Sequence, residues 1–170
     1  MENSINFNLI QALQFISILL TGLLAGLFYG YDCSVIRGLG NLTDDIYLQS
    51  FQSINKAIQN PYFFISFVGN LLVLPLMTWL SYKNCSRTTF YLFTSATLIY
   101  LIGVFVVTIF GNVSLNEKLA KFSISTASTN ELSEMRKAFE KPWNCYHTIR
   151  TVASIVSFGL AIFSILKSKF

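Results

Sequence analysis

The sequence predicts an all-α integral membrane protein, a bundle of four membrane-spanning helices with one amphipathic surface helix in the first long loop. Hydrophobic residues make up 53% of the 170 residues and charged residues only 12%, which is about half the charged fraction of a soluble domain. Four apolar stretches each approach the roughly 20 residues that cross a bilayer. The length suits one domain over residues 1–170, with no room for a separate soluble catalytic module.

The first predicted span covers residues 9–31, where only Gln, Ser, Thr and Gly interrupt the large apolar side chains. Gly22, Gly26 and Gly30 recur every four residues and form a smooth ridge that lets another helix approach closely. The stretch follows a polar start and is longer than the core of a signal peptide, so we expect a retained span. Residues 32–40 then take the chain out of the membrane.

A surface helix is predicted for residues 44–59, within the first long connection. Thr43 is a suitable N-cap residue, and Asp44 and Asp45 fall in the first turn, where the helix dipole favours acids. The apolar residues that can share one face are Ile46, Phe51, Ile54 and Ile58. The segment is too polar to span, so it lies on the membrane or covers the bundle.

Hydropathy also defines the other three spans. The second covers residues 62–82 after an Asn-Pro pair, and the short turn KNCSR leads to the third, residues 89–111. A long polar loop, residues 112–142, precedes the fourth span, residues 143–166. Four spans place both termini and the short turn on one side of the membrane, and the two long connections on the other.

The distribution of basic residues predicts the orientation. The short segments on the side of the termini carry Lys83, Arg87, Lys167 and Lys169. Basic residues in short segments favour the cytoplasmic side, whereas long loops translocate more easily. We therefore expect the termini in the cytoplasm.

Polar residues of the fourth span share one helical face. Their spacing of three and four places together Trp143, His147, Arg150, Thr151 and Ser154. Polar groups inside a membrane are costly and need a partner or a purpose. We expect a polar pocket in the half of the bundle near the long loops, with His147 and Arg150 as catalytic candidates.

Other spans carry polar or aromatic residues at matching depth. The candidates for binding a substrate in this pocket are Tyr29, Asn60, Asn70, Thr108, Asn112, Asn116 and Trp143. Two simpler interpretations stay open, since Tyr and Trp near span ends often anchor a helix at the interface. Intramembrane Asn, Ser and Thr often only bond helices together, and Arg150 has a stem long enough to reach the interface.

Composition excludes several classes of site. The net charge is +4 without a basic stripe, so no nucleic-acid partner is expected. The chain has one histidine and no CxxC motif, so we expect no metal and no cofactor. Cys33 and Cys145 both fall on the long-loop side, and whether they form a disulfide is left open. The expected partners are the lipid bilayer and a small substrate.

Four segments together resemble the anthrone-oxygenase-like family of small integral membrane proteins. They are GLLAGLFYGY at 22–31, INKAIQNPYF at 54–63, NVSLNEKLA at 112–120, and Trp143 followed by His147 and Arg150-Thr151. The matches run in order over nearly the whole chain. Ser114 stands where the family usually has proline, and His147 where it more often has asparagine.

The resemblance implies oxidation of an anthrone or related aromatic compound by molecular oxygen, without a cofactor. Such a site needs a base, a donor that stabilises an anion and a dry aromatic slot. The expected roles are His147 as base, Arg150 with Asn112 or Asn116 on the oxyanion, and Trp143 with Tyr29 as walls.

Competing hypotheses come from other classes of protein. A non-catalytic scaffold, lipid-binding or assembly protein would use the same polar residues only to lock the bundle. A thiol-redox protein would need Cys33 and Cys145 to pair. A transporter is disfavoured because no acid lies in mid-span and no internal repeat is present. A haem site has only His147 in its favour. The oligomeric state is not predicted.

Overall fold

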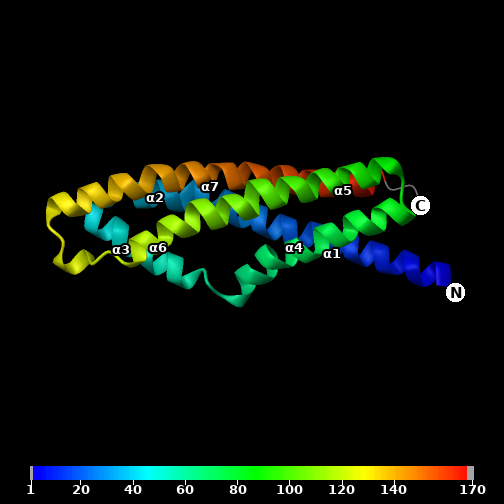
Figure 1. Cartoon of the computed structure of the whole chain (residues 1–170), viewed down its shortest axis with the longest axis horizontal. Helices are drawn as coiled ribbons and strands as arrows, with labels where there is room; N and C mark the ends of the chain where they lie inside the picture. Colours follow the sequence, from blue (N-terminus) through cyan, green and yellow to red (C-terminus); the bar gives the residue numbers. More distant parts are fainter. Residues whose placement is uncertain (1, 168–170) are drawn as a thin grey trace.

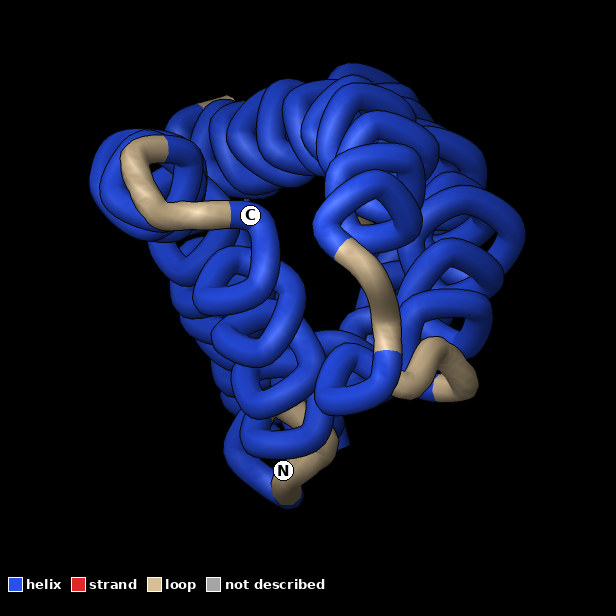
Figure 2. The backbone as a smooth tube through the Cα atoms, turned by 90° about the vertical axis from the view of Figure 1, so that its left-hand side faces the viewer, coloured by secondary structure: helices blue, strands red, loops and turns tan. Residues whose placement is uncertain are grey.

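The computed structural model describes residues 2–167, and the side chains of residues 9–167. Its elements in that range are helices, and no strand occurs there. Figure 1 shows four long helices lying side by side, with both termini and the turn between α4 and α5 at one end. The connections around α3 and before α7 lie at the opposite end, called here the long-loop end. In Figure 2 the helices are seen end on, grouped around a common axis.

The first long helix consists of α1 (Glu2–Gly30), the π-helical turn η1 (Tyr31–Val35) and α2 (Ile36–Gly40). The surface helix α3 covers Asp44–Ala57, and α4 covers Pro61–Asn84. The third long helix consists of α5 (Arg87–Ile99), η2 (Tyr100–Val106), η3 (Thr108–Val113) and α6 (Ser114–Ala120). The short helix η4 (Ile124–Thr126) precedes α7 (Thr129–Leu166).

Four of these helices are long and apolar enough to cross a membrane. They begin and end at Leu9–Gly40, Pro61–Asn84, Arg87–Ala120 and Thr129–Leu166. Helices satisfy all their backbone polar groups within one segment, which is why they can lie in lipid. The predicted all-α membrane bundle is therefore confirmed, and the chain is a multi-pass membrane protein.

The helices extend beyond the predicted spans at the long-loop end. Residues 32–40 continue the first helix instead of forming a loop, and most of the predicted loop 112–142 is helical. The start of α7 is fixed by a capping box in which the Ser128 hydroxyl accepts from the Glu131 backbone N–H, while the Glu131 carboxylate accepts from the Ser128 N–H. Pro142 lies inside α7 and does not begin it.

The predicted amphipathic helix exists as α3, and its buried face includes the predicted Phe51 but is shifted from the predicted one. Tyr47, Leu48 and Phe51 are buried, whereas Ile46, assigned to the apolar face from its spacing, is 47% exposed. Thr43 is the N-cap, yet its hydroxyl donates to the Asp45 carboxylate and accepts no hydrogen bond from the helix backbone. This hydrogen bond lowers the pKa of Asp45.

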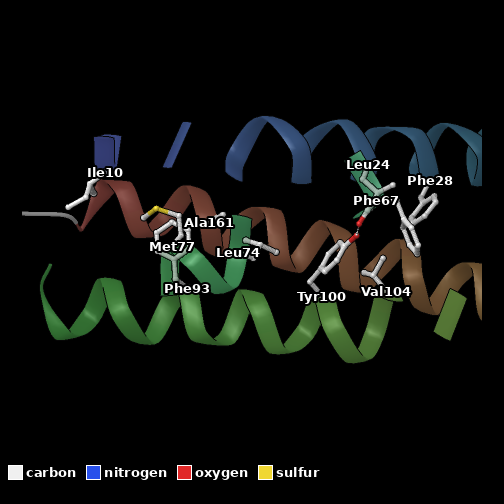
Figure 3. Packing of buried hydrophobic residues seen from close by; sticks show 10 residues of the cluster. All are labelled: Ile10, Leu24, Phe28, Phe67, Leu74, Met77, Phe93, Tyr100, Val104 and Ala161. Atoms are coloured by element: carbon white, nitrogen blue, oxygen red, sulfur yellow. Dashed lines mark hydrogen bonds between the residues drawn. The ribbon is translucent and has the colours of Figure 1, made fainter. Parts of the chain in front are cut away.

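Two apolar clusters stabilise the structure. One lies along the bundle and includes Leu24, Phe28, Phe67 and Tyr100, with the Tyr100 hydroxyl donating to the Phe67 carbonyl (Figure 3). The other lies at the long-loop end and joins α3 to the third and fourth long helices; its buried members are Tyr47, Leu48, Phe51, Leu119, Phe139 and Trp143. Phe28 and Trp143 thus mark the boundary between the two clusters.

Small residues allow the third and fourth long helices to touch. A Cβ added at Gly103 would lie 2.6 Å from the Ala153 Cβ, and one at Gly111 would lie 2.6 Å from the Tyr146 ring. On the predicted glycine ridge of α1, only Gly22 has such a neighbour, the ring of Phe158. The other two glycines of that ridge have no atom within 4 Å of an added Cβ, so the close helix approach occurs at Gly103 and Gly111.

Candidate functional site

The candidate site lies on the inward face of α7, where the two apolar clusters meet. The five residues predicted to share this face, Trp143, His147, Arg150, Thr151 and Ser154, are all buried. Helical spacing of three and four produces this alignment. The Thr151 hydroxyl donates to the His147 carbonyl, and the Ser154 hydroxyl donates to the Thr151 carbonyl. These two residues therefore serve the helix itself, and the first three form the site.

Arg150 is a buried cation between two aromatic rings. Its guanidinium carbon lies 4.4 Å from the centre of the Phe28 ring and 5.2 Å from that of Trp143. Its Nε and Nη2 both donate to Nδ1 of His147, at 3.1 and 2.9 Å. Within residues 9–167 no carboxylate forms an ion pair with it. A buried charge without a counter-ion is costly in a membrane, so the site favours an anionic ligand.

His147 is fully buried and held at both ring nitrogens. Nε2 lies 3.1 Å from the Phe28 carbonyl and donates to it, because Nδ1 must accept from Arg150. The ring stacks on Trp143 at a centroid distance of 5.0 Å and an angle of 10°. These bonds define a neutral imidazole whose only lone pair faces Arg150. The expected role of His147 as a base is therefore not supported, and its visible role is to position Arg150.

The aromatic wall contributed by the first helix is Tyr31 and not Tyr29, which is 58% exposed. The Tyr31 ring lies 5.3 Å from His147 and 5.6 Å from Trp143. Two residues along a helix correspond to about 200°, so Tyr29 and Tyr31 point in nearly opposite directions. The spacing of three from Phe28 to Tyr31 is the signal that identifies the correct tyrosine.

Two asparagines of the third helix hold Trp143. Asn112 donates from Nδ2 to the Trp143 carbonyl at 3.1 Å, and Asn116 accepts from the indole Nε1 at 2.8 Å. Both were predicted at the site and both lie there. Asn112 Oδ1 and the Thr108 hydroxyl, one turn earlier, are buried with no hydrogen-bond partner in the part of the chain described. Unpaired buried polar atoms in a native structure call for a partner, such as a ligand or a water molecule.

The remaining predicted binding residues, Asn60 and Asn70, bond in or next to their own helix, and Asn70 Oδ1 is buried with no hydrogen-bond partner among the described residues. Asn60 is the N-cap of α4, since its side chain accepts from the Phe63 backbone N–H at 3.1 Å. Asn70 is buried and donates to the Ser66 carbonyl within α4 at 2.7 Å. Neither has a hydrogen bond to Trp143, His147 or Arg150 among the bonds of the described residues. Polarity at a matching depth was thus not sufficient to place a residue in the site.

The helix α3 covers the site at the long-loop end. Phe51 packs edge-on against Trp143 at 5.0 Å and lies 6.5 Å from Tyr31. Gln52 donates from Nε2 to the carbonyls of Leu119 and Phe122, at 2.8 and 3.1 Å. The α3 cover therefore bridges the first, third and fourth long helices.

Arg136 fastens the α3 cover to α7. It forms ion pairs with Asp44 at 2.9 Å and Glu140 at 2.8 Å, and donates to the carbonyls of Gly40 and Leu42. Its guanidinium carbon also lies 4.3 Å from the centre of the Tyr47 ring. Burial raises the pKa of Tyr47, with Glu140 adding to this shift and Arg136 opposing it. Arg136 was not among the predicted site residues, because it lies in the segment 112–142 that was predicted to be a loop.

The cysteines lie outside the cluster formed by Trp143, His147 and Arg150. No disulfide occurs among the described residues, and Cys33 and Cys145 are exposed. Cys145 borders an open apolar groove of about 700 Å³ on the outer side of α7; the other lining residues are Ile99, Thr148, Ile149, Val152, Ala153 and Val156. No group of three or more His, Cys, Asp or Glu side chains that could hold a metal ion occurs among the described residues.

Comparison with models of known protein families finds a match over most of the chain. The model of a family described as "Anthrone oxygenase" matches residues 51–160. This range begins in α3 and includes Asn112, Asn116, Trp143, His147 and Arg150. Neither the curated proteins nor the solved structures yield a significant match.

Proposed function

Since the chain belongs to the anthrone oxygenase family, we propose that it is a membrane-embedded oxygenase that oxidises an anthrone-like aromatic compound with molecular oxygen. The bilayer concentrates apolar substrates, and the site is built within the bundle from aromatic residues and one cation. We also propose that the termini lie in the cytoplasm, because the basic residues Lys83, Arg87 and Lys167 lie in short segments at the end of the bundle that holds the termini.

The observation that carries the proposal is the buried guanidinium of Arg150, which has aromatic and imidazole neighbours but no ion pair within residues 9–167. An anthrone that loses a proton from its CH₂ group becomes an aromatic oxyanion. A fixed cation in a dry site stabilises such an anion far more than water does. The rings of Phe28 and Trp143, which both contact the guanidinium of Arg150, suit an aromatic ligand.

The reaction balances without a further reactant. The CH₂ carbon loses a proton to water, and the electron pair left behind reduces molecular oxygen and forms a C–O bond. Protonation of the outer oxygen gives a hydroperoxide. Loss of the second hydrogen as a proton breaks the O–O bond, leaving a ketone and hydroxide, which becomes water. One anthrone and one oxygen molecule thus give one anthraquinone and one water.

In this scheme Arg150 binds the oxyanion, and His147 fixes the direction of the guanidinium through Nδ1. Trp143 is a wall of the slot and is itself held by Asn112 and Asn116. Holding the donor before the reaction avoids reorganisation as negative charge develops. The chain's own contribution is therefore acidification of the substrate by a fixed cation.

The test measures oxygen consumption by the purified protein in detergent with dithranol, a dihydroxylated anthrone, as substrate. Arg150→Gln removes the cation, and we expect turnover to fall about a hundredfold or more. Arg87→Gln is the matched control, because Arg87 is exposed at the opposite end of the bundle. Turnover of the wild type no faster than dithranol autoxidation would contradict the proposal and favour a non-catalytic binding or scaffold role.

Orientation needs its own measurement. We expect a C-terminal epitope tag to be cleaved by added protease in inverted vesicles and to be protected in right-side-out vesicles. The reverse pattern would place the long-loop end, and with it the site, on the cytoplasmic side.

A further inference from the structure

We propose that the hydroxyl of Tyr31 is a second hydrogen-bond donor to the substrate oxyanion at Arg150, an inference that rests on the proposed oxygenase function. The starting observation is that this oxygen is buried and has no hydrogen-bond partner among the described residues. Buried hydroxyls are nearly always paired, and an unpaired one costs about 1–3 kcal/mol. Such a group in a native structure requires an explanation, and a ligand oxygen supplies one.

The position of the ring supports this role. Tyr31 packs against His147 at 5.3 Å and against Trp143 at 5.6 Å, the same two side chains that surround the guanidinium of Arg150. Tyr31 and Arg150 are also close enough to interact electrostatically. The phenol and the guanidinium, from the first and fourth long helices, therefore border one region of the bundle.

The backbone at Tyr31 is π-helical, as it also is in η2 and η3 of the third long helix. Tyr31 is the first residue of the π-helical turn η1, which interrupts the first long helix at the level of the site. Segments of π-helix are less stable than α-helix and occur frequently at functional sites. The π-helical turn therefore starts at Tyr31, the residue whose phenol ring packs against His147 and Trp143 of α7.

Two donors from different helices would form an oxyanion hole. Arg150 supplies charge and Tyr31 supplies a neutral O–H, and both would bind the anion more strongly than the neutral ketone. Stabilisation of that kind accelerates the reaction instead of only tightening substrate binding. The competing explanation is that Tyr31 is merely an aromatic wall, and a wall would function equally well without its hydroxyl.

Tyr31→Phe separates these explanations, with Tyr29→Phe as a matched control at an exposed position two residues away. With dithranol we expect Tyr31→Phe to lower kcat/KM about tenfold to a hundredfold, mainly through kcat, and Tyr29→Phe to leave it unchanged. The melting temperature of Tyr31→Phe should be unchanged or higher, since the substitution removes an unpaired buried hydroxyl. A fully active Tyr31→Phe variant would overturn the inference while leaving the oxygenase proposal intact, provided that Arg150→Gln is inactive.

A binding measurement tests the inference even if no turnover is found. The probe is danthron, the dihydroxyanthraquinone that corresponds to dithranol, titrated while tryptophan fluorescence is recorded. We expect Tyr31→Phe to weaken binding of the ionised phenolate form about tenfold and that of the neutral form less. Equal affinity of wild type and Tyr31→Phe for the phenolate would overturn the inference.

Discussion

The guanidinium of Arg150 and the imidazole of His147, three residues apart on α7, share two hydrogen bonds that end on the same ring nitrogen. The second imidazole nitrogen is bonded to the Phe28 carbonyl of the first long helix. The cation is therefore oriented by a neutral group and not neutralised by an acid. Its charge remains available to a ligand, and this relationship leads to the first two predictions.

Arg150→Met should abolish turnover of dithranol with little change in stability. Burying a charge without an acid is costly, so an apolar side chain of similar length removes that cost. The substitution also leaves Nδ1 of His147 without a donor, which costs about 1–3 kcal/mol. Because the two effects oppose each other, the melting temperature in detergent should change by only a few degrees. A large loss of stability would mean that Arg150 is a structural residue.

His147→Asn should retain a substantial share of turnover, whereas His147→Leu should lose most of it. An asparagine side chain offers an oxygen that can accept from Arg150, and leucine offers none. The measurement is oxygen consumption against pH for both variants and the wild type. If His147→Asn were active only at alkaline pH, His147 would be the base after all, because hydroxide would then be replacing it.

Gly103→Ala should destabilise the bundle, and Gly26→Ala should not. An added Cβ at Gly103 would lie 2.6 Å from the Ala153 Cβ, while nothing lies within 4 Å of one at Gly26. Overpacking of this kind costs about 1–3 kcal/mol, whereas alanine in an open helix position is favoured by up to about 1 kcal/mol. Thermal unfolding of the two variants in the same detergent should shift in opposite directions. A stable Gly103→Ala variant would show that η2 and α7 can separate at no cost.

Arg136→Ala should loosen the α3 cover without unfolding the bundle. The substitution removes two ion pairs and leaves the carbonyls of Gly40 and Leu42 without their donor. Hydrogen exchange of residues 41–60 should become faster, while exchange in α4 should stay slow. Lys137→Ala, at the adjacent exposed position, is the control and should match the wild type. Unchanged exchange in Arg136→Ala would mean that packing of Phe51 alone holds α3.

Hydropathy was sufficient to predict the number of spans and the fold class, because a membrane helix must be apolar over its whole crossing length. It was not sufficient to predict the helix ends. The capping box at Ser128 and Glu131 starts α7 well before the apolar stretch. A polar helical segment outside the membrane has no hydropathy signal, so the continuation of the first and third helices was also missed.

The inward face of α7 was predictable from spacing alone, since Trp143, His147 and Arg150 must point in one direction. What faces them from other helices depends on rotation and depth, which one sequence does not specify. For that reason Tyr29 was chosen over Tyr31, and Asn70 was placed in the site although it bonds within α4. The bonds that Asn112 and Asn116 make to Trp143 agree with their predicted location.

The contacts of α3 also determine the order in which the protein can be completed during synthesis. Residues 44–57 emerge early, but the groups that hold them come much later in the chain. Gln52 forms its hydrogen bond with the Leu119 carbonyl, 67 positions later in the chain. The Leu42 carbonyl accepts a hydrogen bond from Arg136, 94 positions later. Until the last span is inserted, the aromatic side of α3 lacks Phe139 and Trp143 and has partners only in the first and third long helices, such as Tyr31 and Leu119. A chain truncated before α7 would therefore have spans but no site.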